Sequence, residues 1–163
     1  MGRHHIKVLL PSVFQSKSYT CGSTVLWAVC QFYDVVSSEK ELIKACKTNA
    51  SDGTRPADII RVAREYGLCV KSKSGMTVED LKSHLDSGRP VICAIQAYDN
   101  GHYVAVCGYD KARIYFEDPS VRQSPSSLTH QEFKSAWWDT DGDGKMFRRF
   151  GIVVWQCKSR RNC

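Results

Sequence analysis

The chain has 163 residues, with 42% hydrophobic and 25% charged residues, a balance that excludes intrinsic disorder and suits one domain with its own core. The net charge of +6 gathers at Arg148-Arg149 and in the C-terminal tail. It does not form a basic stripe interleaved with aromatic residues, so a nucleic-acid partner is not expected. No apolar run approaches the roughly 18–20 residues that cross a bilayer, and the start lacks a signal-peptide pattern, so no membrane partner is expected.

The first half of the chain has the apolar spacing and the end signals of helices. From Val25 to Tyr33, apolar side chains recur at the spacing of one helix face. Ser38 with Glu41 resembles a capping box before a second helix. A third and a fourth helix are bounded by residues that favour helix ends, namely Thr54-Arg55-Pro56 with Gly67, and Thr77 with Gly88.

The second half is dominated by short apolar runs typical of strands. They span residues 91–95, 102–107, 113–117 and 151–155, and a short helix over residues 129–136 interrupts them. Helices first and strands later, mostly in hairpin order, predict an α+β fold in which an N-terminal helical layer packs on an antiparallel sheet. With no repeat or linker, the chain is expected to be a single domain over residues 1–163, with a core from about 10 to 156 and a basic tail from 157 to 163.

Eight cysteines would suggest disulfides in a secreted chain, but several lie inside apolar strand patterns. Examples are Cys93 in VICAI and Cys107 in YVAVCGY. No Cys-x-x-Cys pair occurs, so neither a structural zinc site nor a thioredoxin-type pair is expected. Most of these cysteines are therefore expected to be buried free thiols, which indicates a reducing, cytoplasmic location.

Cys21 stands at the start of the first predicted helix, in the stretch FQSKSYTCGSTVLWAVCQFY. The unpaired N–H groups and the dipole of a helix N-terminus favour an anion, so the position suits a thiolate nucleophile. The small Gly22 and Ser23 that follow would let a substrate backbone approach closely. The alternative is a buried structural cysteine, which is the simpler interpretation of a Cys-Gly pair taken alone.

His102 and Asp118 are the candidate base and its orienting partner. The two residues are equally far in sequence from Asp110, the middle of the predicted turn between their strands. In a regular antiparallel hairpin such residues lie opposite each other, with Cβ atoms about 4.5–5.5 Å apart. The imidazole and the carboxylate are therefore expected to meet, unless a bulge changes the register. Pro119 ends the second strand, so Asp118 is expected at the edge of that element.

Gln15 lies six residues before Cys21 and carries a side-chain amide. Acyl transfer by a thiolate builds a tetrahedral oxyanion, which fixed N–H donors stabilise. An amide beside the backbone N–H of Cys21 would supply such a donor. A loop glutamine without a role is the alternative for this residue alone, and the order Gln, Cys, His, Asp favours the catalytic reading.

These motifs together resemble the bacteriocin-processing, double-glycine-leader cysteine peptidase family. The resemblance rests on Gln15-x5-Cys21-Gly22, on GHYVAVCGYD around His102 and on DPS at Asp118, and it covers roughly residues 10–155. The segments DGTRPADIIRVAREYGL, TVEDLKSHLDSGRPVICAI and LTHQEFKSAWW are also similar to recurring segments of that family. The resemblance implies a papain-like fold. It also implies that Cys21 is the nucleophile, His102 the general base, Asp118 its orienting partner and Gln15 the oxyanion-hole donor.

The chain also departs from that family. Thr20 precedes the cysteine where members often carry an acidic or amide residue, and Ser23 stands where many have proline. The membrane and ATPase portions of the transporter-linked members are not in this sequence, nor is a Walker-type glycine-rich loop. These departures argue against a double-glycine leader as the substrate and leave the thiol hydrolase chemistry in place.

Three functions are compatible with these residues. The first is a cysteine peptidase that acts on a peptide or protein through an acyl-enzyme. The second is an acyltransferase or glutamine deamidase with the same triad, because one thioester intermediate serves all three reactions. The third is a non-catalytic peptide-binding domain, which the presence of Cys21 disfavours. None of them requires a metal or an organic cofactor.

The motif DTDGDG matches the start of a calcium loop, with oxygen ligands at Asp139, Asp141 and Asp143. Such a loop closes with a bidentate glutamate at its twelfth position. Phe150 occupies that position here and cannot bind a cation. The motif is therefore expected to be an acidic turn rather than a metal site.

Overall fold

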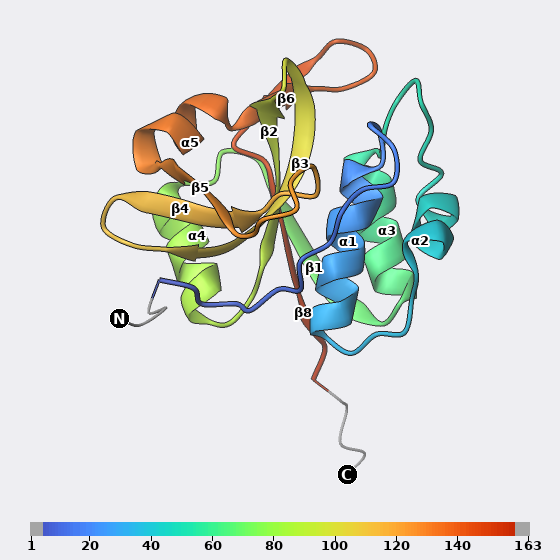
Figure 1. Ribbon diagram of the computed structural model, residues 1–163, viewed down its shortest axis with the longest axis horizontal. Helices are drawn as coiled ribbons and strands as arrows, with labels where there is room; N and C mark the ends of the chain where they lie inside the picture. The colour runs from blue at the N-terminus through green and yellow to red at the C-terminus, as the bar shows by residue number, and fades with distance from the viewer. Residues whose placement is uncertain (1–4, 159–163) are drawn as a thin grey trace.

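A six-stranded antiparallel sheet forms the centre of the computed structural model, which describes residues 5–158 (Figure 1). Its strand order is β1-β8-β2-β3-β4-β5, and a separate two-stranded sheet pairs β6 with β7. The strands are β1 (Leu68–Lys73), β2 (Val91–Ala97), β3 (Asn100–Tyr109), β4 (Arg113–Glu117), β5 (Ser126–Thr129), β6 (Trp138–Thr140), β7 (Met146–Arg148) and β8 (Gly151–Gln156). The predicted α+β class is confirmed. The last five residues of the predicted basic tail, 159–163, lie outside the described residues.

Five helices flank this sheet. Helices α1 (Cys21–Phe32), α2 (Glu39–Ala45) and α3 (Pro56–Glu65) gather on one side, and α4 (Val78–Asp86) and α5 (His130–Ala136) lie on the other (Figure 1). The layer of the first three helices is the N-terminal helical layer that the sequence predicts. Across residues 5–158, no helix combines the length and the apolar character that a membrane crossing needs.

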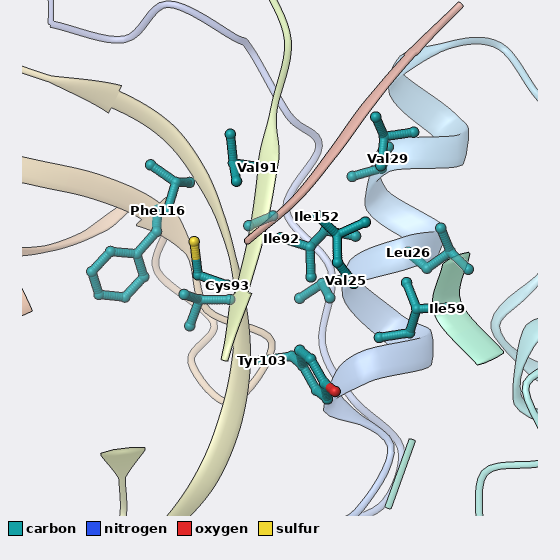
Figure 2. Packing of buried hydrophobic residues seen from close by; sticks show 14 of the residues in the cluster. Val25, Leu26, Val29, Ile59, Val91, Ile92, Cys93, Tyr103, Phe116 and Ile152 are labelled. Carbon is teal, nitrogen blue, oxygen red and sulfur yellow. The ribbon is translucent and has the colours of Figure 1, made fainter. Parts of the chain in front are cut away.

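Both faces of the central strands are buried. Ile92 of β2 points toward α1 and packs near Val25, whereas its neighbours Val91 and Cys93 point to the other side, where Phe116 of β4 lies (Figure 2). Because the sheet is covered on both faces, β2 reads as a continuous apolar run without polar alternation.

The predicted helix ends are present with small differences. Thr77 and Asp80 form a full capping box at the start of α4. Ser38 caps α2 by accepting from Glu41 N at 3.2 Å, but its hydroxyl donates to the Glu41 carboxylate, so only half of a capping box forms. Gly67, with φ +85°, follows the end of α3 and adopts the left-handed conformation that glycine favours.

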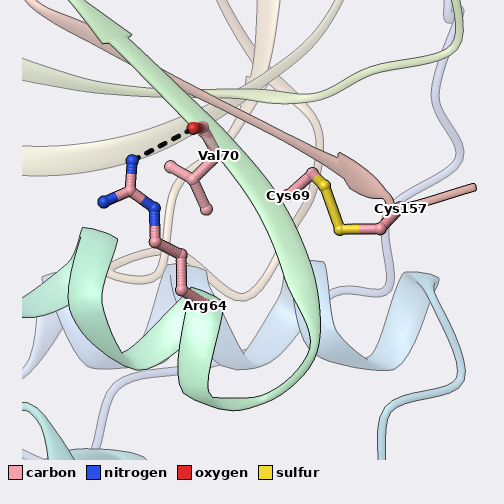
Figure 3. Close-up of a disulfide and its surroundings, with 4 residues drawn as sticks. All are labelled: Arg64, Cys69, Val70 and Cys157. Carbon is pink, nitrogen blue, oxygen red and sulfur yellow. Dashed lines mark hydrogen bonds between the residues drawn. A yellow bond between two sulfur atoms is a disulfide. The ribbon is translucent and has the colours of Figure 1, made fainter.

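A disulfide joins Cys69 of the edge strand β1 to Cys157, just beyond β8 (Figure 3). The sequence analysis did not identify this pair. It closes a loop with a sequence separation of 88, and a bond of this kind stabilises a fold by roughly 2–4 kcal/mol. Five other cysteines of the described chain are free and buried, as expected for most of the eight; they are Cys21, Cys30, Cys46, Cys93 and Cys107.

Candidate active site

Cys21 is the first residue of α1, and its side chain is almost fully buried. Its neighbour Thr20 occupies the N-cap position without making a side-chain cap hydrogen bond, and the first turn contains no acidic residue. The first hydrogen bond of the helix runs from Thr24 N to Thr20 O. The N–H groups of the first turn therefore have no side-chain cap, and Cys21 lies at the positive end of the helix dipole.

Glu39 holds both the loop before α1 and the first turn of α1 in place. Its carboxylate accepts hydrogen bonds from Thr24 Oγ1 at 2.8 Å and from Ser16 N at 2.9 Å. One carboxylate on α2 thus connects the first turn of α1 to the loop that leads into it. Glu39 could not be predicted from the sequence, because the contact is tertiary and no local pattern marks it.

Gly22 is required for packing, which differs from the role expected of it. A Cβ atom at this position would lie 2.6 Å from Thr54 Cβ and 3.0 Å from Tyr103 Cδ2. Ser23 is also buried and donates to Thr20 O at 3.1 Å. The space beside these residues is therefore occupied by protein rather than left open for a substrate backbone.

Gly22→Ala is expected to destabilise the fold by about 1–3 kcal/mol, because Thr54 or the start of α1 must move to admit the methyl group. The denaturant midpoint measures this change. Gly142→Ala is the matched control, since an added Cβ there meets nothing within 4 Å in the described part of the chain. Equal midpoints for the two variants would contradict the packing role.

His102 and Asp118 are in direct contact and nearly buried. His102 Nε2–H donates to Asp118 Oδ1 at 2.7 Å, and both residues are 5% exposed. Burial lowers the pKa of His102, but the hydrogen bond with Asp118 and the influence of the Cys21 thiol outweigh it and raise that pKa to about 9. The imidazolium form is therefore favoured between a carboxylate on one side and the thiol on the other.

Asp118 is held by further donors. Ser120 N donates to Oδ1 at 2.8 Å, and the hydroxyl of Tyr98 donates to Oδ2 at 2.6 Å. Burial raises the pKa of Asp118, but the hydrogen bonds with His102, Tyr98 and Ser120 outweigh it and keep that pKa below its usual value. The carboxyl is thus a carboxylate. Tyr98 was missed by the sequence analysis, because nothing in the pattern of a turn tyrosine indicates its partner.

The register that suggested this contact is wrong. The hairpin pairs Tyr109 with Ile114, and its register shifts between Val106 and Gly108. The last residue of β4, Glu117, pairs with Ala105, so Asp118 lies beyond the ladder and is not opposite His102. The two side chains meet because the chain leaves the sheet after Glu117. The main error is the predicted turn centre at Asp110, because Tyr109 pairs with Ile114 and the turn is therefore centred between Lys111 and Ala112. A bulge is also present between Val106 and Gly108, but it moves the pairing by only one residue, back toward the predicted register.

Gln15 lies against the loop that follows Asp118. Its backbone N donates to Pro119 O at 2.8 Å, and its side-chain oxygen accepts from Ser120 Oγ at 3.1 Å. Its NH₂ group donates to Lys17 O at 2.9 Å, and a second N–H of that group is available to another acceptor. The structure thus brings Gln15 to the loop that carries Asp118.

A cleft of about 900 Å³ runs beside Cys21. One wall comes from the first residues of α1 and from residues 50–57, and the other from the start of β3 and the turn between β6 and β7. The second wall includes Asp139, Asp141 and Asp143, the residues of the DTDGDG motif. The candidate site therefore adjoins this cleft at Cys21.

The DTDGDG motif forms a turn, as expected. Asp141 Oδ1 accepts from the backbone N–H groups of Asp143 and Lys145 at 3.0 and 2.9 Å, and Asp139 Oδ1 accepts from Thr140 N at 2.8 Å. No group of three or more His, Cys, Asp or Glu side chains within residues 5–158 is arranged to hold a metal ion.

Comparison with known proteins agrees with this architecture. The family model described as the Peptidase_C39 like family matches residues 9–145. An uncharacterized protein of Methanothermobacter thermautotrophicus is 29% identical over 111 residues, which cover 67% of this chain and 71% of that protein.

Two solved structures have a similar fold. One is a double glycine motif protease from an AMS/PCAT transporter in complex with its leader peptide, with a TM-score of 0.72, 19% identity, and coverage of 95% of this chain and 96% of that one. The other is the peptidase domain of Streptococcus ComA, a bi-functional ABC transporter, with a TM-score of 0.69, 21% identity, and coverage of 89% and 97%. The fold is therefore the papain-like fold of C39 peptidases, and the chain belongs to the Peptidase_C39 like family.

Proposed function

We propose that the protein is a cysteine peptidase that cleaves a peptide bond through Cys21, His102 and Asp118. The observation that carries this proposal is the position of the His102 imidazole. Its Nε2–H is bound to the buried Asp118 carboxylate at 2.7 Å. Cys21, the first residue of α1, contributes with Asp118 to raising the pKa of that imidazole. A thiol, a base and an orienting carboxylate in this order are the parts that nucleophilic catalysis needs.

The proposed reaction has two halves. The Cys21 thiolate attacks the peptide carbonyl, and the His102 imidazolium gives its proton to the leaving amine as the C–N bond breaks. A water molecule then attacks the thioester, with the neutral imidazole taking its proton, and the C–S bond breaks to release the acid and regenerate the Cys21 thiolate beside the His102 imidazolium. Asp118 keeps the imidazole in one tautomer and stabilises its charged form.

Oxyanion stabilisation is assigned to the backbone N–H at Cys21 and to the second N–H of the Gln15 amide. Gln15→Ala is therefore expected to lower kcat by about 100-fold while KM changes little, because the donor acts on charge that develops during the reaction. Steady-state kinetics on one peptide measures both constants. Gln131→Ala, on the exposed face of α5, is the matched control and should behave like the parent. A Gln15→Ala enzyme with unchanged kcat would remove Gln15 from the oxyanion hole.

The proposed substrate is a peptide or an extended protein segment. The cleft of about 900 Å³ beside Cys21 supports this class, and a structure with the same fold binds a leader peptide. We also propose that the protein is located in the cytoplasm. The five free thiols favour it, and the Cys69–Cys157 disulfide, a bond typical of oxidising compartments, opposes it.

Capture of the acyl-enzyme tests this function. The protein is incubated with a peptide library, quenched in acid and digested, and the mass of the Cys21 peptide is measured. The proposal predicts an acyl fragment on Cys21, released by water as a free acid. Adding an amine separates the alternatives, since an acyltransferase would convert the fragment to an amide. A library that is cleaved without any acyl fragment on Cys21 would contradict the proposal.

A further inference from the structure

Tyr98 occupies a backbone conformation that suits it poorly. It forms, with Asp99, the two-residue turn between β2 and β3, and the φ angles of the two residues are +54° and +60°. A turn with positive φ at both central positions favours Asn, Asp and Gly, and a bulky aromatic residue is disfavoured there. A strained residue of this kind persists where its side chain is needed.

The side chain of Tyr98 lies on the charged pair of the candidate active site. Its hydroxyl donates to Asp118 Oδ2 at 2.6 Å, while His102 and Ser120 bind Oδ1. Its ring meets the His102 ring edge-on, with centroids 5.3 Å apart and planes at 87°. Tyr98 thus touches both members of the pair, although the residue itself is 61% exposed.

We propose that Tyr98 is a positioning residue that holds the Asp118 carboxylate and the His102 ring in the orientation that the reaction requires. This inference rests on the proposed function of Cys21, His102 and Asp118. With Oδ2 bound by the phenol, the carboxylate cannot rotate without breaking a charge-assisted hydrogen bond, so Oδ1 stays directed at Nε2. Burial and the bond with Asp118 raise the pKa of Tyr98 to about 12, so the phenol remains a donor throughout the neutral range.

Two substitutions separate this role from a structural one. Tyr98→Phe keeps the ring and removes the hydroxyl, and it is expected to lower kcat about tenfold with KM unchanged. Tyr98→Asn removes the side chain but suits the turn, so it should lower kcat at least as much while the melting temperature stays the same or rises. The matched control is Tyr109→Phe, because Tyr109 also donates to a carboxylate, that of Asp86, at 2.8 and 2.9 Å, but away from the site.

A second background tests whether Tyr98 acts through Asp118. In an Asp118→Ala protein no side-chain group is left at this position to bond with the phenol, so Tyr98→Phe should have no further effect on kcat. If the fold loss in kcat of the double variant equals the product of the losses of the two single variants, the proposal is overturned. An unchanged kcat in Tyr98→Phe would also overturn it, as would a fall in melting temperature for Tyr98→Asn that accounts for its lost activity.

A measurement that does not depend on catalysis can show whether the role of Tyr98 or the proposed peptidase function is wrong. That measurement is the titration of Asp118. Removing the phenol takes one donor from the charged carboxyl, so carboxyl NMR should find the pKa of Asp118 higher in Tyr98→Phe than in the parent. Tyr109→Phe should leave it unchanged. An identical Asp118 titration in all three proteins would overturn the role of Tyr98. Equal turnover by Cys21→Ala and the parent would instead overturn the function, whatever that titration gives.

Discussion

Cys21→Ala is expected to lower peptide hydrolysis by at least about 10,000-fold while leaving the fold intact, because no other group replaces the nucleophile. Cys21 is the first residue of α1, and alanine is a strong helix former, so little stability should be lost. Initial rates on a peptide substrate measure the activity, and the melting temperature measures the fold.

Cys30→Ala is the matched control for this substitution. Cys30 lies in the same helix and is fully buried in the core. Its loss should reduce stability through a small cavity but leave turnover near that of the parent. A Cys21→Ala protein that cleaves as fast as Cys30→Ala would contradict the assignment of the nucleophile.

Asp118→Asn is expected to lower kcat by about 100-fold. Asparagine keeps the shape and an oxygen for His102 but removes the negative charge. The loss should be smaller than for Cys21→Ala, because an orienting residue is more dispensable than the nucleophile.

The dependence of kcat on pH should also change in Asp118→Asn. The pKa of His102 is about 9, so the imidazolium that protonates the leaving amine persists below pH of about 9 and is lost above it. The hydrogen bond with Asp118 contributes to raising this pKa, so the alkaline limb of kcat should move to lower pH in Asp118→Asn. An unmoved alkaline limb would contradict the proposed role of the carboxylate.

Asp110→Asn is the matched control. Asp110 also accepts from a tyrosine hydroxyl, that of Tyr115, and from two backbone N–H groups, which lower its pKa to about 2. It lies in the turn between β3 and β4, where a change in charge should leave both kcat and the pH profile as they are.

The helices could be predicted from the sequence because several local signals agree at each of them. In α3, Pro56 stands at the first position, Ile59 and Val62 are buried on one face, and Gly67 follows the end. Strand β1 could not be predicted in the same way. It pairs only with β8 at the edge of the sheet, and its last three residues are exposed, so no apolar alternation marks it.

The contact between His102 and Asp118 was expected, but for a reason that the structure does not support. The prediction placed the centre of the turn at Asp110, but Tyr109 pairs with Ile114, so the centre lies between Lys111 and Ala112. The register shift near Cys107 then changes the pairing by one residue. The carbonyl of Cys107 instead accepts from the backbone of Lys7 and Val8, in a segment that crosses this edge of the hairpin. Such a tertiary cause leaves no trace in the spacing of residues.

The disulfide and Tyr98 could not be predicted for a related reason. Cys69 and Cys157 meet only because β1 and β8 pair, with Cys69 opposite Trp155. Tyr98 lies in a turn with positive φ, and a Tyr-Asp pair is not a recognised signal for such a turn. In each case the chain topology, rather than the local sequence, brings the partners together.

Alkylation of each cysteine by iodoacetamide near neutral pH tests most directly whether the Cys21 thiol is paired with the His102 imidazole. Burial raises the pKa of Cys30 to about 11 and that of Cys46 and Cys107 to about 12, so these thiols should react slowly. Among the free thiols of residues 5–158, peptide mapping by mass spectrometry is predicted to find Cys21 labelled fastest, at a rate that falls in His102→Ala. Labelling of Cys21 no faster than of the buried thiols, and unchanged in His102→Ala, would contradict the account.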